Sequence, residues 1–150
     1  MQKTITLLLC ALLFVAYFFD GFGFACLAHA NIFHLIGNIY ALLVILNFPV
    51  IKRLYFTSLV MAFIVSALAF SLSPPAVGAS GIVLALAAMV CVRNMCRRNF
   101  ICIAALVLAS FIPGMATEVH LYSLLFAFTF DSYRRYIQWL ISYSKKMMQE

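Results

Sequence analysis

The chain alternates between long apolar stretches and short groups of charged residues. Six apolar stretches follow one another: 4–24, 26–51, 54–72, 74–92, 100–113 and 119–130. A helix needs roughly 17–25 predominantly apolar residues to cross the hydrocarbon core of a bilayer. The stretch 119–130 is short by this measure, so its crossing has to be argued from charge. The pattern predicts an all-α membrane protein built as a bundle of six transmembrane helices.

The charged residues give the direction of each crossing. If the stretches alternate in direction and the chain starts inside, all ten Lys and Arg residues fall on one side. Asp20 and Glu118 fall on the other side, which receives no cation. Cytoplasmic loops of membrane proteins carry the excess of Lys and Arg. The sequence thus predicts that both termini are cytoplasmic, and we interpret the protein as a multi-pass protein of a bacterial inner (plasma) membrane.

The composition excludes several other classes of protein. Hydrophobic residues make up 67% of the chain and charged residues only 9%. A soluble domain of this length cannot bury so much apolar surface, and a disordered or nucleic-acid-binding chain would carry far more charge. The expected partner is therefore the lipid bilayer, with no nucleic acid. The five cysteines are an odd set in or near apolar stretches, so we read them as small apolar residues.

Two segments near the termini need separate interpretations. Residues 134–150 form a basic tail, whose start with the preceding residues has the helical spacing of an interfacial amphipathic helix. We assign this tail to the same domain as the six-span region 1–133, since no repeat or linker divides the chain. Lys3 followed by an apolar stretch and by Ala28 and Ala30 also fits a signal peptide, but the stretch 4–24 is long for one.

Polar residues inside a membrane span are costly, so each is a functional candidate. The candidates gather near the predicted outer ends of three stretches: His29, Asn31, His34 and Asn38 in the second, Gly78, Ser80 and Gly81 in the fourth, and His120 in the sixth. His34 and Asn38 are four residues apart, so they share one helix face. Singly, each has a structural explanation: glycines and an amide favour helix packing, and a histidine suits an interface.

Together, these residues supply the groups that acyl transfer requires. That chemistry needs a nucleophile, a base that takes its proton, and donors aimed at the developing oxyanion. Ser80 and His120 can be the first two. His34, Asn38 and the backbone N–H of Ser80 can be the donors. No carboxylate is placed to orient His120, so the sequence predicts a dyad.

The spacing of His29, His34 and Asn38, the Gly78-Ala79-Ser80-Gly81 sequence and the later His120 resembles the rhomboid family of intramembrane serine proteases. The resemblance implies a serine endopeptidase that cleaves in or next to transmembrane helices of membrane protein substrates. It implies that Ser80 is the nucleophile and His120 the base, and that His34 and Asn38 help form the oxyanion hole. His29, Gly78 and Gly81 take supporting places. No cofactor and no metal is expected.

The sequence also departs from the pattern of that family. The first outer connection is only a few residues around 20–25 and lacks a Trp-Arg pair, and Leu84 stands where a tyrosine often packs on the histidine. Small residues are kept at Ser123 and Ala127. An inactive rhomboid-like protein that binds or escorts membrane clients is therefore the alternative.

A third interpretation is a small transporter that uses His29, His34 and His120 as a proton relay or metal site. The chain has no H-E-x-x-H pattern, which argues against a zinc protease. The sequence selects neither a particular substrate nor an oligomeric state.

Overall fold

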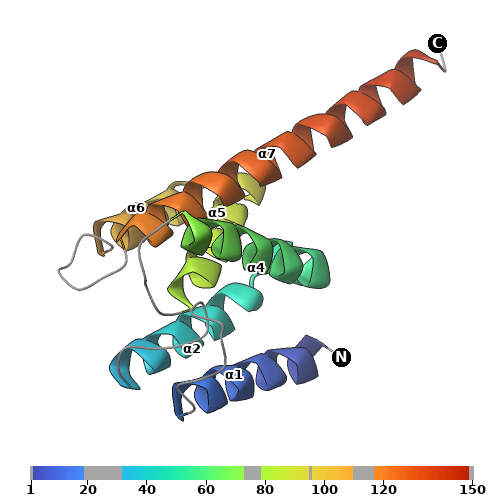
Figure 1. The fold of residues 1–150 in the computed structure, drawn as a ribbon. Helices are drawn as coiled ribbons and strands as arrows, with labels where there is room; N and C mark the ends of the chain where they lie inside the picture. Colours follow the sequence, from blue (N-terminus) through green and yellow to red (C-terminus); the bar gives the residue numbers. More distant parts are fainter. Residues whose placement is uncertain (1, 19–31, 73–78, 95, 110–116, 149–150) are drawn as a thin grey trace.

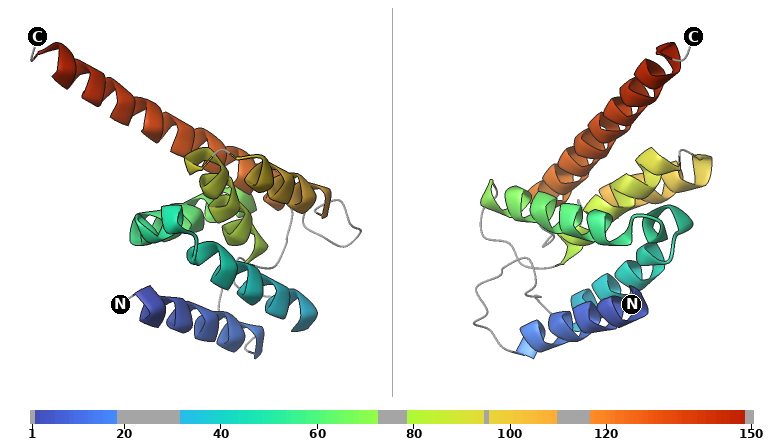
Figure 2. Two further views of the ribbon diagram at one scale, coloured as in Figure 1. Left: turned by 180° about the vertical axis from the view of Figure 1, so that it is seen from behind. Right: turned by 90° about the vertical axis from the view of Figure 1, so that its right-hand side faces the viewer.

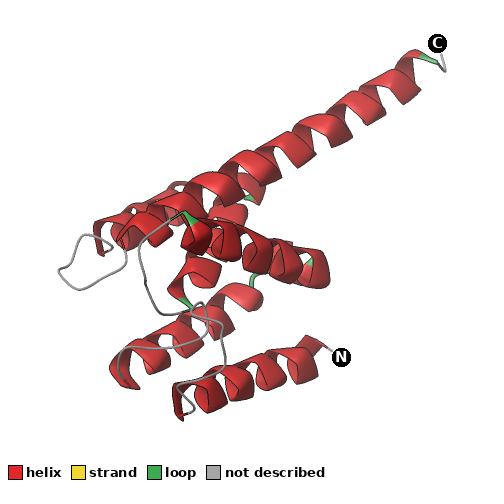
Figure 3. Cartoon of the chain, in the orientation of Figure 1, coloured by secondary structure: helices red, strands yellow, loops and turns green. Residues whose placement is uncertain are grey.

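The structure is a computed structural model that describes residues 2–18, 32–72, 79–94, 96–109 and 117–148. All regular secondary structure in these ranges is helical, without a strand (Figure 3). The helices are α1 (Gln2–Phe18), α2 (Ile32–Leu46), α3 (Pro49–Lys52), α4 (Tyr55–Ser71), α5 (Ser80–Arg93), α6 (Arg97–Ala109) and α7 (Thr117–Met147).

Each of the six apolar stretches overlaps one of the longer helices. The apolar pattern did not indicate α3, a single turn that begins at Pro49. Proline suits this position because the first turn of a helix leaves its N–H groups without intrahelical partners anyway. In the part of the chain that the structure describes, no helix combines the length and the apolarity that a membrane crossing requires. The six crossings therefore stay a prediction.

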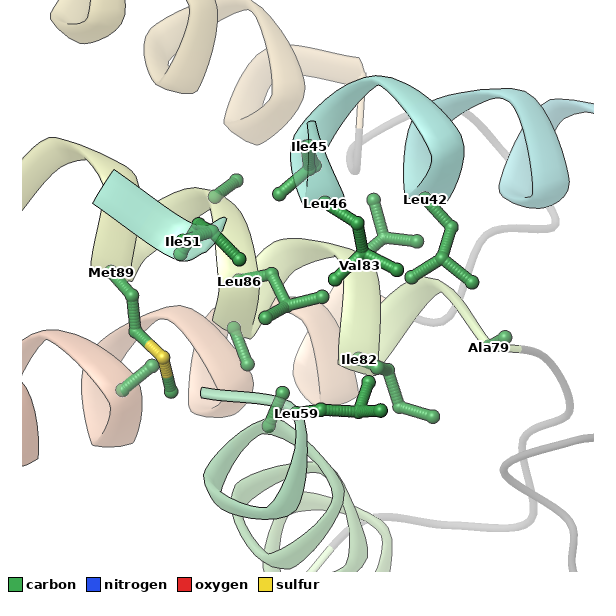
Figure 4. Packing of buried hydrophobic residues seen from close by; sticks show 14 of the residues in the cluster. Leu42, Ile45, Leu46, Ile51, Leu59, Ala79, Ile82, Val83, Leu86 and Met89 are labelled. Carbon is green, nitrogen blue, oxygen red and sulfur yellow. The ribbon is translucent and has the colours of Figure 1, made fainter. Parts of the chain in front are cut away.

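Helix α5 is the centre of the bundle. Every residue from Ser80 to Val90 is buried, and α5 contacts α2, α3, α4, α6 and α7 (Figures 1 and 2). In the core, Leu42 and Leu46 of α2 lie close to Val83 of α5, and Leu59 of α4 lies close to Ile82 (Figure 4). A helix that is apolar on all sides is stable only where other elements or lipid cover it. The surrounding helices provide this cover, so the start of α5 has a fixed position.

The outer faces of the surrounding helices are also apolar. Large apolar side chains are exposed on α1 and on four of the helices around α5, namely Leu7, Phe33, Phe56, Phe100 and Leu125. The side chain of Phe33 is 83% exposed. Soluble monomers rarely expose extended apolar patches. This surface therefore fits contact with an apolar solvent better than contact with water.

A buried ion pair joins the C-terminal end of α5 to the middle of α7. The Arg93 guanidinium donates to both carboxylate oxygens of Asp131, with Nη2 to Oδ1 at 2.6 Å and Nε to Oδ2 at 2.8 Å. The two side chains are only 9% and 5% exposed. Arg93 Nη1 also donates to Ser58 Oγ of α4 at 2.6 Å, and Ser58 Oγ donates to the Leu54 carbonyl. One arginine thus connects three helices at this end of the bundle.

Helix α7 includes most of the basic tail. Residues 134–147 are helical, as their spacing indicates, and they continue without a break the helix that begins at Thr117. The physical reason is that no glycine or proline follows Thr117, and charged residues do not by themselves end a helix. At about 1.5 Å per residue, this 31-residue helix is the longest element described, and its C-terminal part extends away from the other helices (Figure 1).

The ion pair generates the first prediction. Asp131→Asn removes the negative charge and leaves the Arg93 guanidinium buried without a counter-charge, so the protein should lose roughly 3–5 kcal/mol of stability. Thermal unfolding of the purified chain in detergent measures this loss. Glu118→Gln makes the same charge change at an exposed position on α7 and should leave the unfolding temperature nearly unchanged. Equal shifts for the two variants would show that the ion pair does not hold α5 and α7 together.

Candidate active site

Ser80 and His120 form the most distinctive polar contact of the bundle. His120 Nε2 and Ser80 Oγ are 2.6 Å apart, within the range that proton transfer to a general base requires. Ser80 is 8% exposed and His120 is 2% exposed. When Oγ donates to Nε2, the imidazole is neutral and carries its proton on Nδ1. In that state the ring can accept the serine proton.

The two side chains meet because each lies in the first turn of its helix. Ser80 is the first residue of α5, and His120 is the fourth of α7. The two helices run in the same direction, since the Arg93–Asp131 pair joins them again about 17–20 Å further along. Contacts at both ends set the register between α5 and α7. A shift by one residue would separate Oγ from Nε2.

The start of α5 also presents backbone donors beside Ser80. Ala79 precedes the helix without a side-chain cap, and the first intrahelical bond runs from Val83 N–H to the Ala79 carbonyl. The N–H groups of Ser80 and Gly81 therefore have no intrahelical acceptor. They lie at the positive end of the helix dipole. This arrangement favours negative charge next to Ser80 Oγ.

Helix α2 adds two further polar side chains on the same side of the bundle. His34 lies one helical turn before Asn38 and on the same face of α2. Asn38 is buried, one helical turn before Leu42, and Leu42 packs near Val83 of α5 (Figure 4). Asn38 Nδ2 is buried and makes no hydrogen bond to the described residues. A buried amide donor without an acceptor is costly, so this group could donate to a bound acceptor.

Close packing around Gly81 sets the position of Ser80. A Cβ atom at Gly81 would lie 2.5 Å from Ser66 Oγ of α4 and 3.0 Å from Ser123 Oγ of α7. Only glycine allows the three helices to approach so closely. Ser123 and Ala127, the small residues kept on the last helix, are fully buried and permit this approach. Val119 lines the same contact, one residue before His120.

Some expected site residues fall outside this description. His29, Asn31 and Gly78 lie outside the described residues, as does the short first connection 20–25. Asp131 is three helical turns from His120 and is bound by Arg93, so it does not orient the imidazole. No group of three or more potential metal-ligating side chains occurs in the described ranges.

A comparison with models of protein families assigns the chain to a family. The family model for the rhomboid domain matches residues 19–130, which is most of the 150-residue chain. The chain belongs to the rhomboid family. No curated protein and no solved structure gives a significant match to it. The rhomboid match covers α2 to α6 and the part of α7 that carries His120.

The sequence interpretation of this rhomboid domain missed two contributions to the site. Ser66, which packs on Gly81, was not recognised, although it belongs to a series of small residues at helical spacing on α4 (Ser58, Ala62, Ser66 and Ala69), all of them buried. Such series indicate close helix packing in membranes. The Arg93–Asp131 pair was also missed, although both residues lie at the same predicted end of their spans.

The contact at Gly81 gives a prediction for the rhomboid fold. Gly81→Ala forces a methyl group against Ser66 Oγ, and the overpacking should destabilise the protein by roughly 1–3 kcal/mol. Adding Ser66→Ala removes the nearest atom and should restore part of the loss. Gly37→Ala is the matched control, since a Cβ there meets nothing within 4 Å and should stabilise α2 slightly. Unfolding in detergent measures all four proteins, and similar effects at Gly81 and Gly37 would contradict the packing argument.

Proposed function

We propose that this rhomboid-family protein is an active intramembrane serine endopeptidase. Its reaction is the hydrolysis of a peptide bond in or next to a transmembrane helix of a membrane protein substrate. The observation that carries the proposal is the 2.6 Å contact between His120 Nε2 and Ser80 Oγ, made between two helices that belong to different parts of the chain. Family membership supports the same reaction class.

The first half of the reaction forms an acyl-enzyme. Ser80 Oγ attacks the carbonyl carbon of the scissile bond while His120 Nε2 accepts the hydroxyl proton. The carbonyl oxygen becomes an oxyanion in the tetrahedral intermediate. When the C–N bond breaks, His120 gives its proton to the leaving amine. The product is an ester of Ser80 and the first half of the substrate.

The second half returns the free enzyme. A water molecule attacks the ester carbonyl, and His120 takes a proton from this water. Collapse of the second tetrahedral intermediate releases a carboxylic acid product, and the proton returns to Ser80 Oγ. The backbone N–H of Ser80 and Nδ2 of Asn38 are the proposed donors to both oxyanions. His34 is proposed as a further contributor, and His29, Gly78 and Gly81 as supporting residues.

The lipid bilayer is the proposed environment of this reaction. The exposed apolar residues on the outer helix faces support contact with lipid, and the distribution of Lys and Arg supports six crossings with both termini in the cytoplasm. In this orientation Ser80 lies near the extracytoplasmic surface, where water can enter. We propose a bacterial plasma membrane as the location and single transmembrane helices as substrates.

The first functional prediction concerns the nucleophile. A fluorophosphonate probe should form a covalent adduct with Ser80 Oγ, fluoride being the leaving group, and intact mass spectrometry should detect the added mass. Ser80→Ala should abolish labelling and cleavage of a single-span substrate, and His120→Ala should reduce both strongly. Ser123→Ala removes another buried hydroxyl from the same region and should keep both activities.

This experiment also separates the two rhomboid alternatives. Labelling that persists in Ser80→Ala would contradict the assignment of the nucleophile. A correctly folded wild-type chain that gives neither adduct nor cleavage would favour the inactive protein that binds or escorts membrane clients. Cleavage abolished by a chelator would point to a metal site instead.

The second functional prediction concerns the oxyanion. Asn38→Ala removes one donor, and loss of one such donor typically lowers kcat about 100- to 1000-fold. KM should change much less, because the donor binds the transition state more strongly than the substrate. Asn47→Ala is the control, since Asn47 is an exposed amide that donates to the Leu43 carbonyl just after α2. Equal kcat values for the two variants would remove Asn38 from the proposed oxyanion hole.

A further inference from the structure

A second polar site lies at the opposite end of α5 from Ser80. It is a pocket of about 380 Å³ between α3 with the two residues that follow it, the end of α5 and the middle of α7. Four arginines line it, Arg53, Arg93, Arg134 and Arg135, together with one acidic residue, Asp131. Its size falls within the range of small-molecule sites, roughly 300–1,000 Å³.

The contacts of the four arginines leave positive charge in the pocket without a counter-charge. Asp131 is fully engaged by Arg93, and Arg135 Nη1 donates to the Val92 carbonyl. Arg134 Nη1 is buried and has no hydrogen-bond acceptor among the described residues. Arg53 follows α3 and is exposed. A buried guanidinium N–H without an acceptor is costly, and a bound anion would supply the acceptor.

The chemistry of the lining favours a phosphate group. Guanidinium groups bind phosphate oxygens through paired, charge-assisted hydrogen bonds. Arg53 and Arg134 reach the pocket from separate segments, so they can hold one anion from two sides. Val50 and Leu54 give the pocket an apolar edge, which suits a ligand that carries hydrocarbon next to its phosphate.

We propose that this pocket binds a phosphate-bearing anion, and that in the membrane this anion is the headgroup of an anionic phospholipid. The lipid source follows from the predicted orientation, which places all Lys and Arg residues on the cytoplasmic side, where anionic lipids gather. Basic pockets between helices on that side are suited to such headgroups. The phosphate chemistry does not depend on the orientation or on proteolysis by Ser80.

Fluorescence of Trp139 can test whether the pocket binds an anionic phospholipid. Trp139 is the chain's one tryptophan, follows the pocket residue Gln138 directly and is exposed. The full chain is placed in phosphatidylcholine nanodiscs with increasing fractions of phosphatidylglycerol, one of the two lipids being brominated to quench tryptophan. Quenching by brominated phosphatidylglycerol should exceed quenching by brominated phosphatidylcholine at the same mole fraction.

Charge-matched variants separate a site from general attraction. Arg134→Gln and Arg53→Gln each remove a charge-assisted contact and should weaken the preference for phosphatidylglycerol roughly tenfold. Lys145→Gln removes the same charge from an exposed position further along α7 and should keep the wild-type preference. Because Arg53 is exposed, Arg53→Gln should fold normally. This variant therefore tests the phosphate contact if Arg134→Gln fails to fold.

Calorimetry tests whether free phosphate is the ligand. Inorganic phosphate is titrated at constant ionic strength into the chain in phosphatidylcholine nanodiscs. A preference for phosphatidylglycerol that depends on Arg134 and Arg53 supports the lipid headgroup. Phosphate binding that depends on these two residues, without a lipid preference, supports a free phosphate as the ligand. The proposal is overturned if neither ligand binds, or if Lys145→Gln weakens binding as much as the pocket variants. Fluorophosphonate labelling of Ser80 is a separate readout, so failure here and failure of the proposed proteolysis are distinguishable.

Discussion

The packing of α7 against α5 is the interaction on which the remaining features of this rhomboid domain depend. The two helices are in contact through Ser80 and His120 at one end, through Gly81 and Ser123 near it, and through Arg93 and Asp131 at the other end. Small residues permit the approach and polar pairs fix its register. A helix pair held only by apolar contacts could slide or rotate at low cost, because such contacts are not directional. Here, the directional contacts restrict both movements.

The sequence alone predicted most of the helices, because long apolar stretches between charges have few other structures available in lipid. It could not predict where α7 ends. Charges were used to divide the chain after Phe130, but Arg134 and Arg135 are good helix formers and the helix continues through them. The single turn α3 was missed for a related reason, since the apolar stretch that contains it continues without interruption from α2.

The residues of the candidate site were also predicted, because polar groups inside apolar stretches are few. Their contacts were not. The distance between Ser80 Oγ and His120 Nε2 depends on how closely α4, α5 and α7 pack, and this depends on Ser66, which carries no chemical signal of its own. The Arg93–Asp131 pair was missed because the charges indicated where stretches end and which side of the membrane they face, and not which charges pair. Two opposite charges at the same predicted depth could have been recognised as partners.

The continuous helix α7 has a mechanical consequence. It is one stiff rod that carries His120 near its start and the arginine-lined pocket well beyond its contact with Gly81. If the rod tilts about Ser123, His120 lies about 4.5 Å from the pivot and Gln138 about 22 Å on the other side. A sideways displacement of the distal arm therefore reaches the imidazole reduced about fivefold. Such a lever would keep the contact between His120 and Ser80 nearly in place when the projecting C-terminal arm is displaced sideways.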